Sequence, residues 1–247
     1  MWCCADWPCC LGGRFMQFLL QTSKLVISLP MSHFDTRRTM MVDTQVRPSD
    51  VTKFPIIHAM QAVPREVYVP DDKREAAYLG DNLDLVPGRV ILEPRTFAKM
   101  LDALDIGPEE MVLDLGCGLG YSAAVLAQLA DTVVAVEEDE AMASEAETTL
   151  AREGVMNAVV LTGPLAEGAA KHGPYDVIIV EGGIEVLPEA IEAQLKDGGR
   201  IAVLVMDGAL GTVKIGQRVG DRLVWRWGFN AAASVLNGFE KEAAFAL

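Results

Sequence analysis

The sequence has few cysteines, histidines and basic residues, and each shortage argues against a class of protein. Four of its five cysteines lie within the first ten residues and only Cys117 lies beyond them, which excludes a disulfide framework for the rest of the chain. Each of the three histidines lacks cysteine or carboxylate partners at ligand spacing, so we expect no metal site. With 21 basic against 35 acidic residues, the net charge of −14 argues against binding nucleic acid or an anionic membrane.

Long apolar runs are also missing, because no uncharged stretch reaches the about 18 residues that a membrane-spanning helix needs. The nearest candidate, residues 15–31, is interrupted by Gln17, Gln21 and Lys24. We therefore expect a soluble, cytoplasmic protein. Residues 1–30 hold few charges and four of the cysteines, which predicts an extension or a misassigned start. A targeting segment and a metal or redox role are the alternatives.

After residue 31 the pattern changes twice. Residues 31–95 read as a helical cap, in which residues 50–60 have helical apolar spacing and Pro64 follows them. Short apolar runs then alternate with helical stretches, which predicts an open α/β sheet with mostly parallel strands. The predicted strands are 111–115, 132–136, 158–162, 176–180 and 200–205, and the predicted helices are 120–130, 140–153 and 188–195.

The C-terminal part of the chain reads differently, since no helical stretch follows Val205. Residues 212–219 and 223–229 flank the turn at Gly220 and predict an antiparallel hairpin. Residues 240–246 are a candidate for a final edge strand.

The most informative segment is VLDLGCGLGY, residues 112–121. A strand that ends in Gly116, Gly118 and Gly120 allows a sharp turn and a close approach of the backbone to a ligand. Glu137 ends the next strand about 20 residues later, where a carboxylate can accept both hydroxyls of a ribose. Tyr121 replaces the last glycine of the dinucleotide fingerprint, which weakens an NAD interpretation. A purely structural turn is the alternative.

Four segments resemble S-adenosylmethionine-dependent methyltransferases: VLDLGCGLGYSAAVLA (112–127), VVAVEE (133–138), PYDVIIVEGG (174–183) and LPEAIEAQLKDGGRIAVLV (187–205). Upstream, AMQAVPREVYVP (59–70) narrows the resemblance to the protein-L-isoaspartate O-methyltransferase family. The resemblance implies a Rossmann-like sheet of seven strands, S-adenosyl-L-methionine as cofactor, and proteins or peptides with isoaspartyl residues as substrates for repair. It divides the chain into an extension (1–30), a helical cap with acceptor loop (31–95) and a cofactor-binding domain (96–247).

The same resemblance assigns site residues. The residues that it implies for cofactor binding are Asp114, Gly116, Gly118, Gly120, Tyr121, Glu137 and Glu181.

The acceptor loop departs from the family pattern, because a segment resembling GQTISQP is replaced by GRVILEP at residues 88–94. Leu92 stands at the serine position that helps to bind the acceptor carboxylate, and Glu93 stands at the glutamine position. An apolar side chain donates no hydrogen bond, and an added anion repels a carboxylate unless Arg89 or Arg95 neutralises it. Leu92 and Glu93 are therefore expected to mark the acceptor pocket and to limit isoaspartyl activity. An alternative for the loop is that Leu92 only packs it while Arg89 or Arg95 binds the acceptor. The alternatives for the function are a methyltransferase with another acceptor and a non-catalytic, cofactor-binding regulator.

Overall fold

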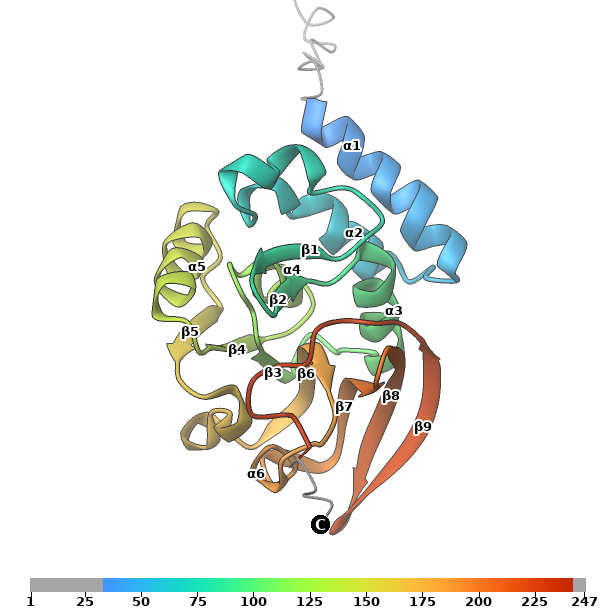
Figure 1. Ribbon diagram of the computed structural model, residues 1–247, viewed down its shortest axis with the longest axis vertical. Helices are drawn as coiled ribbons and strands as arrows, with labels where there is room; N and C mark the ends of the chain where they lie inside the picture. The colour runs from blue at the N-terminus through green and yellow to red at the C-terminus, as the bar shows by residue number, and fades with distance from the viewer. Residues whose placement is uncertain (1–32, 242–247) are drawn as a thin grey trace, which may run out of the picture. The chain divides into compact units, whose positions relative to one another are not determined.

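A seven-stranded sheet forms the centre of residues 33–241, the part of the chain that the computed structural model describes (Figure 1). Its strands follow the order β5-β4-β3-β6-β7-β8-β9. The parallel strands are β3 (Met111–Leu115), β4 (Thr132–Glu137), β5 (Ala158–Thr162), β6 (Tyr175–Ile184) and β7 (Leu195–Asp207). The antiparallel strands at one edge are β8 (Leu210–Val219) and β9 (Arg222–Asn230). The predicted α/β sheet with a C-terminal antiparallel hairpin is confirmed.

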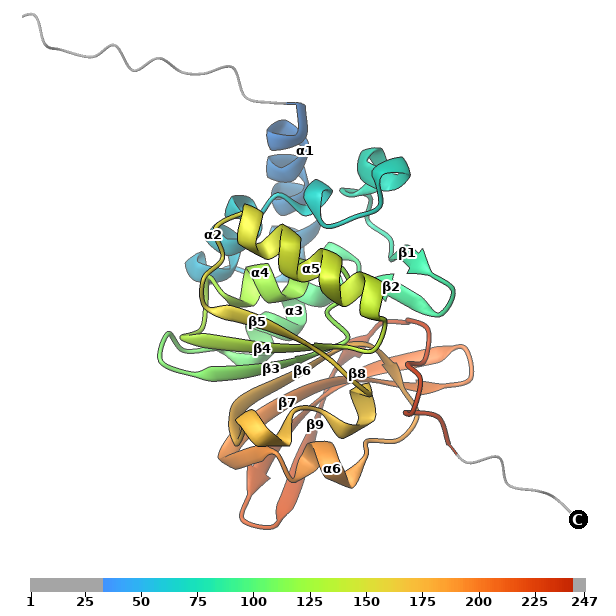
Figure 2. The same ribbon diagram turned by 90° about the vertical axis from the view of Figure 1, so that its left-hand side faces the viewer.

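Helices cover both faces of this sheet (Figure 2). The helices on one face are α3 (Pro94–Leu104), α4 (Tyr121–Leu126) and α5 (Glu140–Arg152). The other face carries α6 (Glu189–Glu192) and a short 3-10 turn at Leu165–Glu167. Strands buried on both faces explain the nearly continuous apolar runs in the sequence, since Val112 packs toward one cluster and Leu113 toward the other.

Connections along the chain change direction between β3 and β6. From β3 the chain moves outward through β4 to β5, then returns to the other side of β3 to form β6 and β7. Ligands of open α/β sheets bind at the carboxyl ends of the strands beside such a switch point. The glycine loop after β3 lies at this place.

Three predicted helices are shorter than expected. The helix predicted over 120–130 ends early, as α4 (Tyr121–Leu126). The predicted helix 50–60 begins only at Phe54 as α2 (Phe54–Ala62), with Pro55 in its first turn, where a missing N–H costs nothing. The predicted helix 188–195 is reduced to α6, because Leu195 already pairs with Tyr175 of the neighbouring strand.

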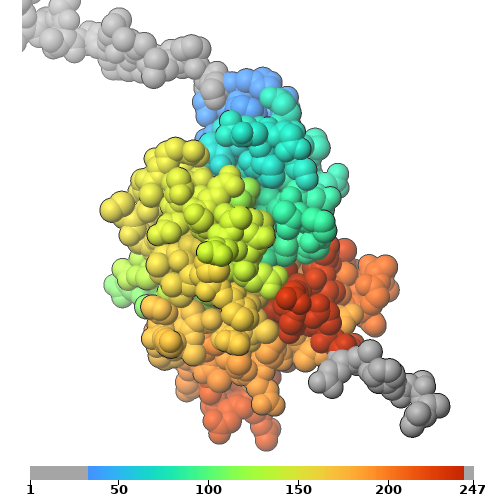
Figure 3. Space-filling model, turned by 60° about the vertical axis from the view of Figure 1, so that its left-hand side comes forward, coloured from blue at the N-terminus to red at the C-terminus, as the bar shows by residue number. Residues whose placement is uncertain are grey.

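The cap contains more than helices. It begins with α1 (His33–Met41) and α2, and continues into a two-stranded antiparallel hairpin of β1 (Leu83–Val86) and β2 (Arg89–Ile91). Figure 3 shows the cap, α5 and the segment 231–241 meeting on one face of the molecule. This arrangement places the hairpin against the glycine loop. Within residues 33–241, no helix combines the length and apolarity that crossing a bilayer requires. Residues 1–30 and 242–246, on which two of the predictions fall, lie outside the described part.

Candidate functional site

The glycine loop joins β3 to α4 through a backbone conformation that other residues rarely adopt. The φ angles of Gly116, Gly118 and Gly120 are +86°, +57° and +94°. A Cβ added at Gly118 would lie 2.6 Å from Cδ1 of Leu85, and one added at Gly116 would lie 3.1 Å from Nη2 of Arg89. The loop is therefore approached closely, and the approaching atoms belong to the β1–β2 hairpin of the same chain.

Glu137 ends β4 beside this loop and is completely buried. Its Oε2 accepts a hydrogen bond from the backbone N–H of Gly118 at 2.8 Å. Its Oε1 accepts from the backbone N–H groups of Glu138 and Asp139 at 2.9 and 3.1 Å. These bonds orient the carboxylate over the glycine loop, as a ribose-binding acid requires.

Arg89 of β2 occupies the outward side of that carboxylate. Its Nη1 donates to Glu137 Oε1 at 2.6 Å and its Nη2 donates to Oε2 at 2.7 Å, which makes a bidentate ion pair. Both side chains are removed from solvent, with 6 % and 0 % exposed. Sequence reasoning considered Arg89 as a neutraliser of Glu93 or as a ligand of the acceptor and missed this contact, although the arginine at the first glutamine of the family's GQTISQP segment was a usable signal.

Several buried polar atoms beside this pair find no hydrogen-bond partner among residues 33–241. They include Asp114 Oδ1, the Tyr121 hydroxyl, Glu181 Oε1 and Arg65 Nη1, which come from four different segments. Arg65 also stacks over the ring of Tyr121, with its Cζ 4.6 Å from the ring centre. Buried polar atoms normally have partners, so this group indicates a polar space that a ligand can fill.

The charges of this group indicate which kind of ligand fits. Burial raises the pKa of Asp114, the charge of Glu137 adds to the rise, and a hydrogen bond from Ser122 opposes it. Burial also raises the pKa of Glu181, and the charge of Asp114 raises it further. Raised pKa values mean that these two carboxyls bind protons more readily than free ones, and the guanidinium groups of Arg65 and Arg89 partly oppose the rise. A cationic ligand would favour their charged forms. S-adenosylmethionine carries a sulfonium and an ammonium group, so these carboxyls fit such a cofactor.

Leu92 and Glu93 have structural contacts in this arrangement. Leu92 is 1 % exposed, and its carbonyl accepts a hydrogen bond from Nη2 of Arg65 at 2.8 Å. Glu93 precedes α3, where its Oε1 accepts from the Thr96 hydroxyl at 2.6 Å and its N–H donates to Asn82 Oδ1 at 2.8 Å. Both residues hold the connection between β2 and α3, and neither side chain offers a free donor to an anion.

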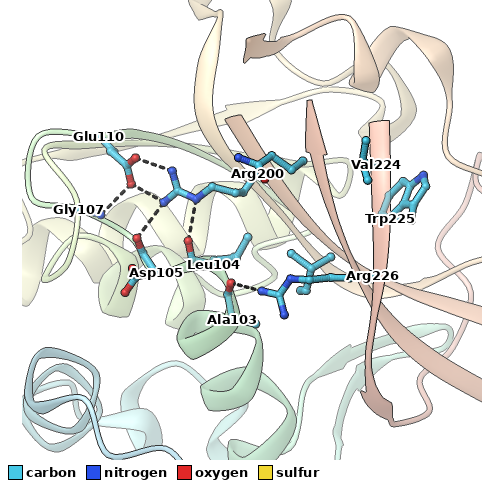
Figure 4. A pocket seen from close by; sticks show the side chains of 11 residues that line it. Ala103, Leu104, Asp105, Gly107, Glu110, Arg200, Val224, Trp225 and Arg226 are labelled. Atoms are coloured by element: carbon cyan, nitrogen blue, oxygen red, sulfur yellow. Dashed lines mark hydrogen bonds and ion pairs between the residues drawn. The ribbon is translucent and has the colours of Figure 1, made fainter. Parts of the chain in front are cut away.

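A separate hollow of about 480 Å³ lies between the C-terminal end of α3 and strands β8 and β9 (Figure 4). Arg200 contacts both oxygens of Glu110 at 2.6 and 2.8 Å and donates to the carbonyl of Leu104 at 2.8 Å. Arg226 donates to the carbonyl of Ala103 at 2.7 Å. Cations at the last carbonyls of a helix stabilise its end. The residues that line the hollow join α3 to the sheet. They lie near the amino-terminal end of β3, whereas the glycine loop follows its carboxyl end.

Comparisons with known proteins agree with this architecture. The family model described as Protein-L-isoaspartate(D-aspartate) O-methyltransferase (PCMT) matches residues 37–224. Protein-L-isoaspartate O-methyltransferase 1 of Rhodopseudomonas palustris (strain HaA2) is 37 % identical over 179 residues, which cover 72 % of this chain and 73 % of that protein. The protein-L-isoaspartate O-methyltransferase of Koribacter versatilis (strain Ellin345) is 33 % identical over 199 residues, covering 81 % and 90 %.

Solved structures show the same fold at lower identity. One protein-L-isoaspartate O-methyltransferase has a TM-score of 0.71 at 22 % identity, covering 83 % of this chain and 66 % of that one. A putative protein-L-isoaspartate O-methyltransferase from Plasmodium falciparum, in complex with S-adenosyl-L-homocysteine, has a TM-score of 0.69 at 16 % identity, covering 82 % and 97 %. From the family model and the curated relatives together, the chain belongs to the protein-L-isoaspartate(D-aspartate) O-methyltransferase family.

Proposed function

We propose that this chain, an S-adenosylmethionine-dependent methyltransferase by its family, methylates the carboxylate of isoaspartyl residues in damaged proteins or peptides. The observation that carries the proposal is the placement of Glu137, whose two oxygens are held over the glycine loop by backbone N–H groups. The proposal includes the cytoplasmic location expected from the sequence.

The residues of the site divide the work of binding. Gly116 and Gly118 leave room for close contact along the loop, and Glu137 presents acceptors for two ribose hydroxyls. Asp114 and Glu181 supply buried carboxyl groups whose charged forms a cationic ligand would favour. The cofactor itself supplies a methyl group on a positively charged sulfur. Since an isoaspartyl carboxylate is ionised at neutral pH, it needs no general base. The chain's part is to align the acceptor and exclude water.

The acceptor side of the proposal is specific to this chain. We retain Leu92 and Glu93 as positions that lower isoaspartyl activity, since the buried Leu92 side chain cannot replace a hydroxyl. The same observation favours a second candidate, methyl transfer to a different acceptor by the same cofactor machinery. The two candidates share every cofactor-binding residue and differ only in the acceptor.

A transfer assay with radiolabelled S-adenosylmethionine separates these candidates. The acceptors are an isoaspartyl peptide, the same peptide with ordinary aspartate as matched control, and a cell extract. We expect label in the isoaspartyl peptide well above the control. Label that appears only in the cell extract would show that the acceptor is not an isoaspartyl residue, and it would favour the second candidate. Binding of S-adenosylhomocysteine with no label in any sample would contradict catalysis and favour a regulator.

A further inference from the structure

The ion pair between Arg89 and Glu137 occupies the place where the cofactor's ribose is expected. We propose that Arg89 is the group that binds the acceptor carboxylate, and that it becomes available only when the ribose displaces it from Glu137. The acceptor half of this proposal rests on the proposed function. The displacement half concerns only the cofactor and this chain's own residues.

Displacement follows from the geometry of the pair. Glu137 already accepts three backbone hydrogen bonds, and the guanidinium approaches its two oxygens from the outward side, along two parallel directions, at 2.6 and 2.7 Å. A ribose diol that binds Glu137 with both hydroxyls needs those same two directions. Arg89 Nη2 also lies 3.1 Å from the position of a Cβ on Gly116, so it fills the space that the glycine leaves open. Arg89 and the ribose therefore exclude each other.

Once displaced, the guanidinium requires another anion. It is 6 % exposed, and its Nε has no hydrogen-bond partner among the described residues. Glu138 is one neighbouring carboxylate, with Oε1 3.8 Å from Nη1, but it is partly exposed and its other oxygen accepts from Asn237 at 3.2 Å. A substrate carboxylate entering beside the loop is a second anion, and a guanidinium fork binds carboxylates with two parallel hydrogen bonds.

Other donors near the acceptor loop are less available. Leu92 has no donor. Arg65 is held in place by the carbonyls of Ala77 and Leu92 and by its stacking on Tyr121, and only its Nη1 has no partner among the described residues. Arg95 lies on α3 with 42 % of its side chain exposed, 3.6 Å from Glu93. Arg89 lies three residues before Leu92 in the same loop. The chain therefore lacks a hydroxyl at residue 92 and has a cation at residue 89 of this loop.

The consequence is a preferred order of binding, with the cofactor first. Without cofactor the cation is neutralised by Glu137, and a substrate carboxylate cannot use it. With cofactor the cation is released, so binding of the peptide and binding of the cofactor strengthen each other by the same factor.

The test measures binding without catalysis. S-adenosylhomocysteine is titrated calorimetrically into the parent and into Arg89→Gln. This variant carries the glutamine that the family's GQTISQP segment has at the position of Arg89. A fluorescent isoaspartyl peptide is then titrated with and without saturating S-adenosylhomocysteine. Arg222→Gln on β9 removes the same charge far from the site and serves as control. Arg95→Gln tests the rival cation.

We expect the parent to bind the peptide about tenfold more tightly when S-adenosylhomocysteine is present. Arg89→Gln is expected to bind S-adenosylhomocysteine about three- to tenfold more tightly, because the competing cation is gone, and to lose the cofactor-dependent gain in peptide affinity. Arg222→Gln and Arg95→Gln are expected to match the parent in both titrations.

Weaker binding of S-adenosylhomocysteine by Arg89→Gln would overturn the displacement, and undiminished peptide binding would overturn the acceptor role. Loss of peptide binding in Arg95→Gln would transfer that role to Arg95. If Arg89→Gln fails to fold, Arg89→Lys keeps the charge without the fork and is expected to bind S-adenosylhomocysteine more tightly while retaining cofactor-dependent peptide binding. A parent that neither binds nor methylates the isoaspartyl peptide would refute the proposed function, whereas the S-adenosylhomocysteine titrations judge the displacement separately.

Discussion

Removing one side of the Glu137–Arg89 ion pair is expected to destabilise the fold more than removing both sides. Glu137→Gln leaves the Arg89 guanidinium, 6 % exposed, without a counter-charge, and Arg89→Gln leaves a buried carboxylate with backbone donors only. Breaking a buried pair from one side costs about 3–5 kcal/mol. Glu137 keeps three backbone N–H bonds when Arg89 is changed, so Arg89→Gln is expected to cost less than this range, about 2–3 kcal/mol.

The double variant Glu137→Gln, Arg89→Gln removes both buried charges, although the amide at residue 137 keeps only one acceptor oxygen for the backbone N–H groups. We expect it to cost no more than Glu137→Gln alone, so that the coupling energy of the cycle reaches at least about 2 kcal/mol, the expected cost of Arg89→Gln. The measurement is equilibrium unfolding in urea at pH 7, with equal m-values as the condition for comparing the four proteins. The total stability of a domain is about 5–15 kcal/mol, so each single variant remains measurable.

An exposed ion pair in the same chain provides the control. Arg47 and Asp43 contact at 3.1 Å with 51 % and 55 % of their side chains exposed, and such pairs contribute about 0–1 kcal/mol. Arg47→Gln should therefore change the unfolding free energy little. Additive single costs at Glu137 and Arg89, within about 0.5 kcal/mol, would refute the buried pair and with it the geometry on which the displacement proposal rests.

Three further predictions concern the loop, the helix end and the buried carboxylates. Gly118→Ala is expected to lower the unfolding free energy by about 1–3 kcal/mol in urea, because its Cβ would lie 2.6 Å from a leucine methyl at a φ of +57°. Gly154 has a φ of +76° and open space around it, so Gly154→Ala should show only the smaller backbone cost. Equal costs for the two variants would contradict the close contact at Gly118. The hydrogen bonds from Arg200 hold the pKa of Glu110 below its usual 4.5, so their stabilisation is complete above that pH and fades as the pH falls through the lowered value. Arg200→Leu should therefore cost about 1–3 kcal/mol at pH 7 and less at pH 3, and a cost that does not depend on pH would contradict the ion pair. Burial raises the pKa of Asp114, so its ionised carboxylate lowers the stability of the fold as the pH rises through the raised value. Asp114→Asn should therefore be stabilised relative to the parent more at pH 8 than at pH 5, and it should bind S-adenosylhomocysteine less tightly. An equal gain in stability at both pH values would refute the raised pKa.

Much of the sheet was predictable from the sequence, because local patterns carry the information. The apolar runs 111–115 and 158–162 form the strands with the predicted bounds. For 111–115 the reason is burial on both faces, which needs apolar residues throughout, whereas 158–162 is a partly exposed edge strand. The hairpin around Gly220 forms because its turn residues and flanking strands agree. The left-handed backbone at Gly116 follows from glycine itself.

Other features depended on partners far away in the sequence. Leu195 has a local pattern typical of a helix, yet it joins the sheet because Tyr175 offers a strand to pair with. The β1–β2 hairpin was not predicted, because its short strands are stabilised by packing against the glycine loop.

Glu137 shows the division most clearly. The sequence alone identified it as the acid at the end of the second strand, because its position after the glycine loop follows from the alternation of strands and helices. Its pairing with Arg89, 48 residues earlier, was decided only when the cap folded onto the sheet. A buried charge must find a counter-charge wherever the fold brings one within reach, and no local pattern encodes that distance.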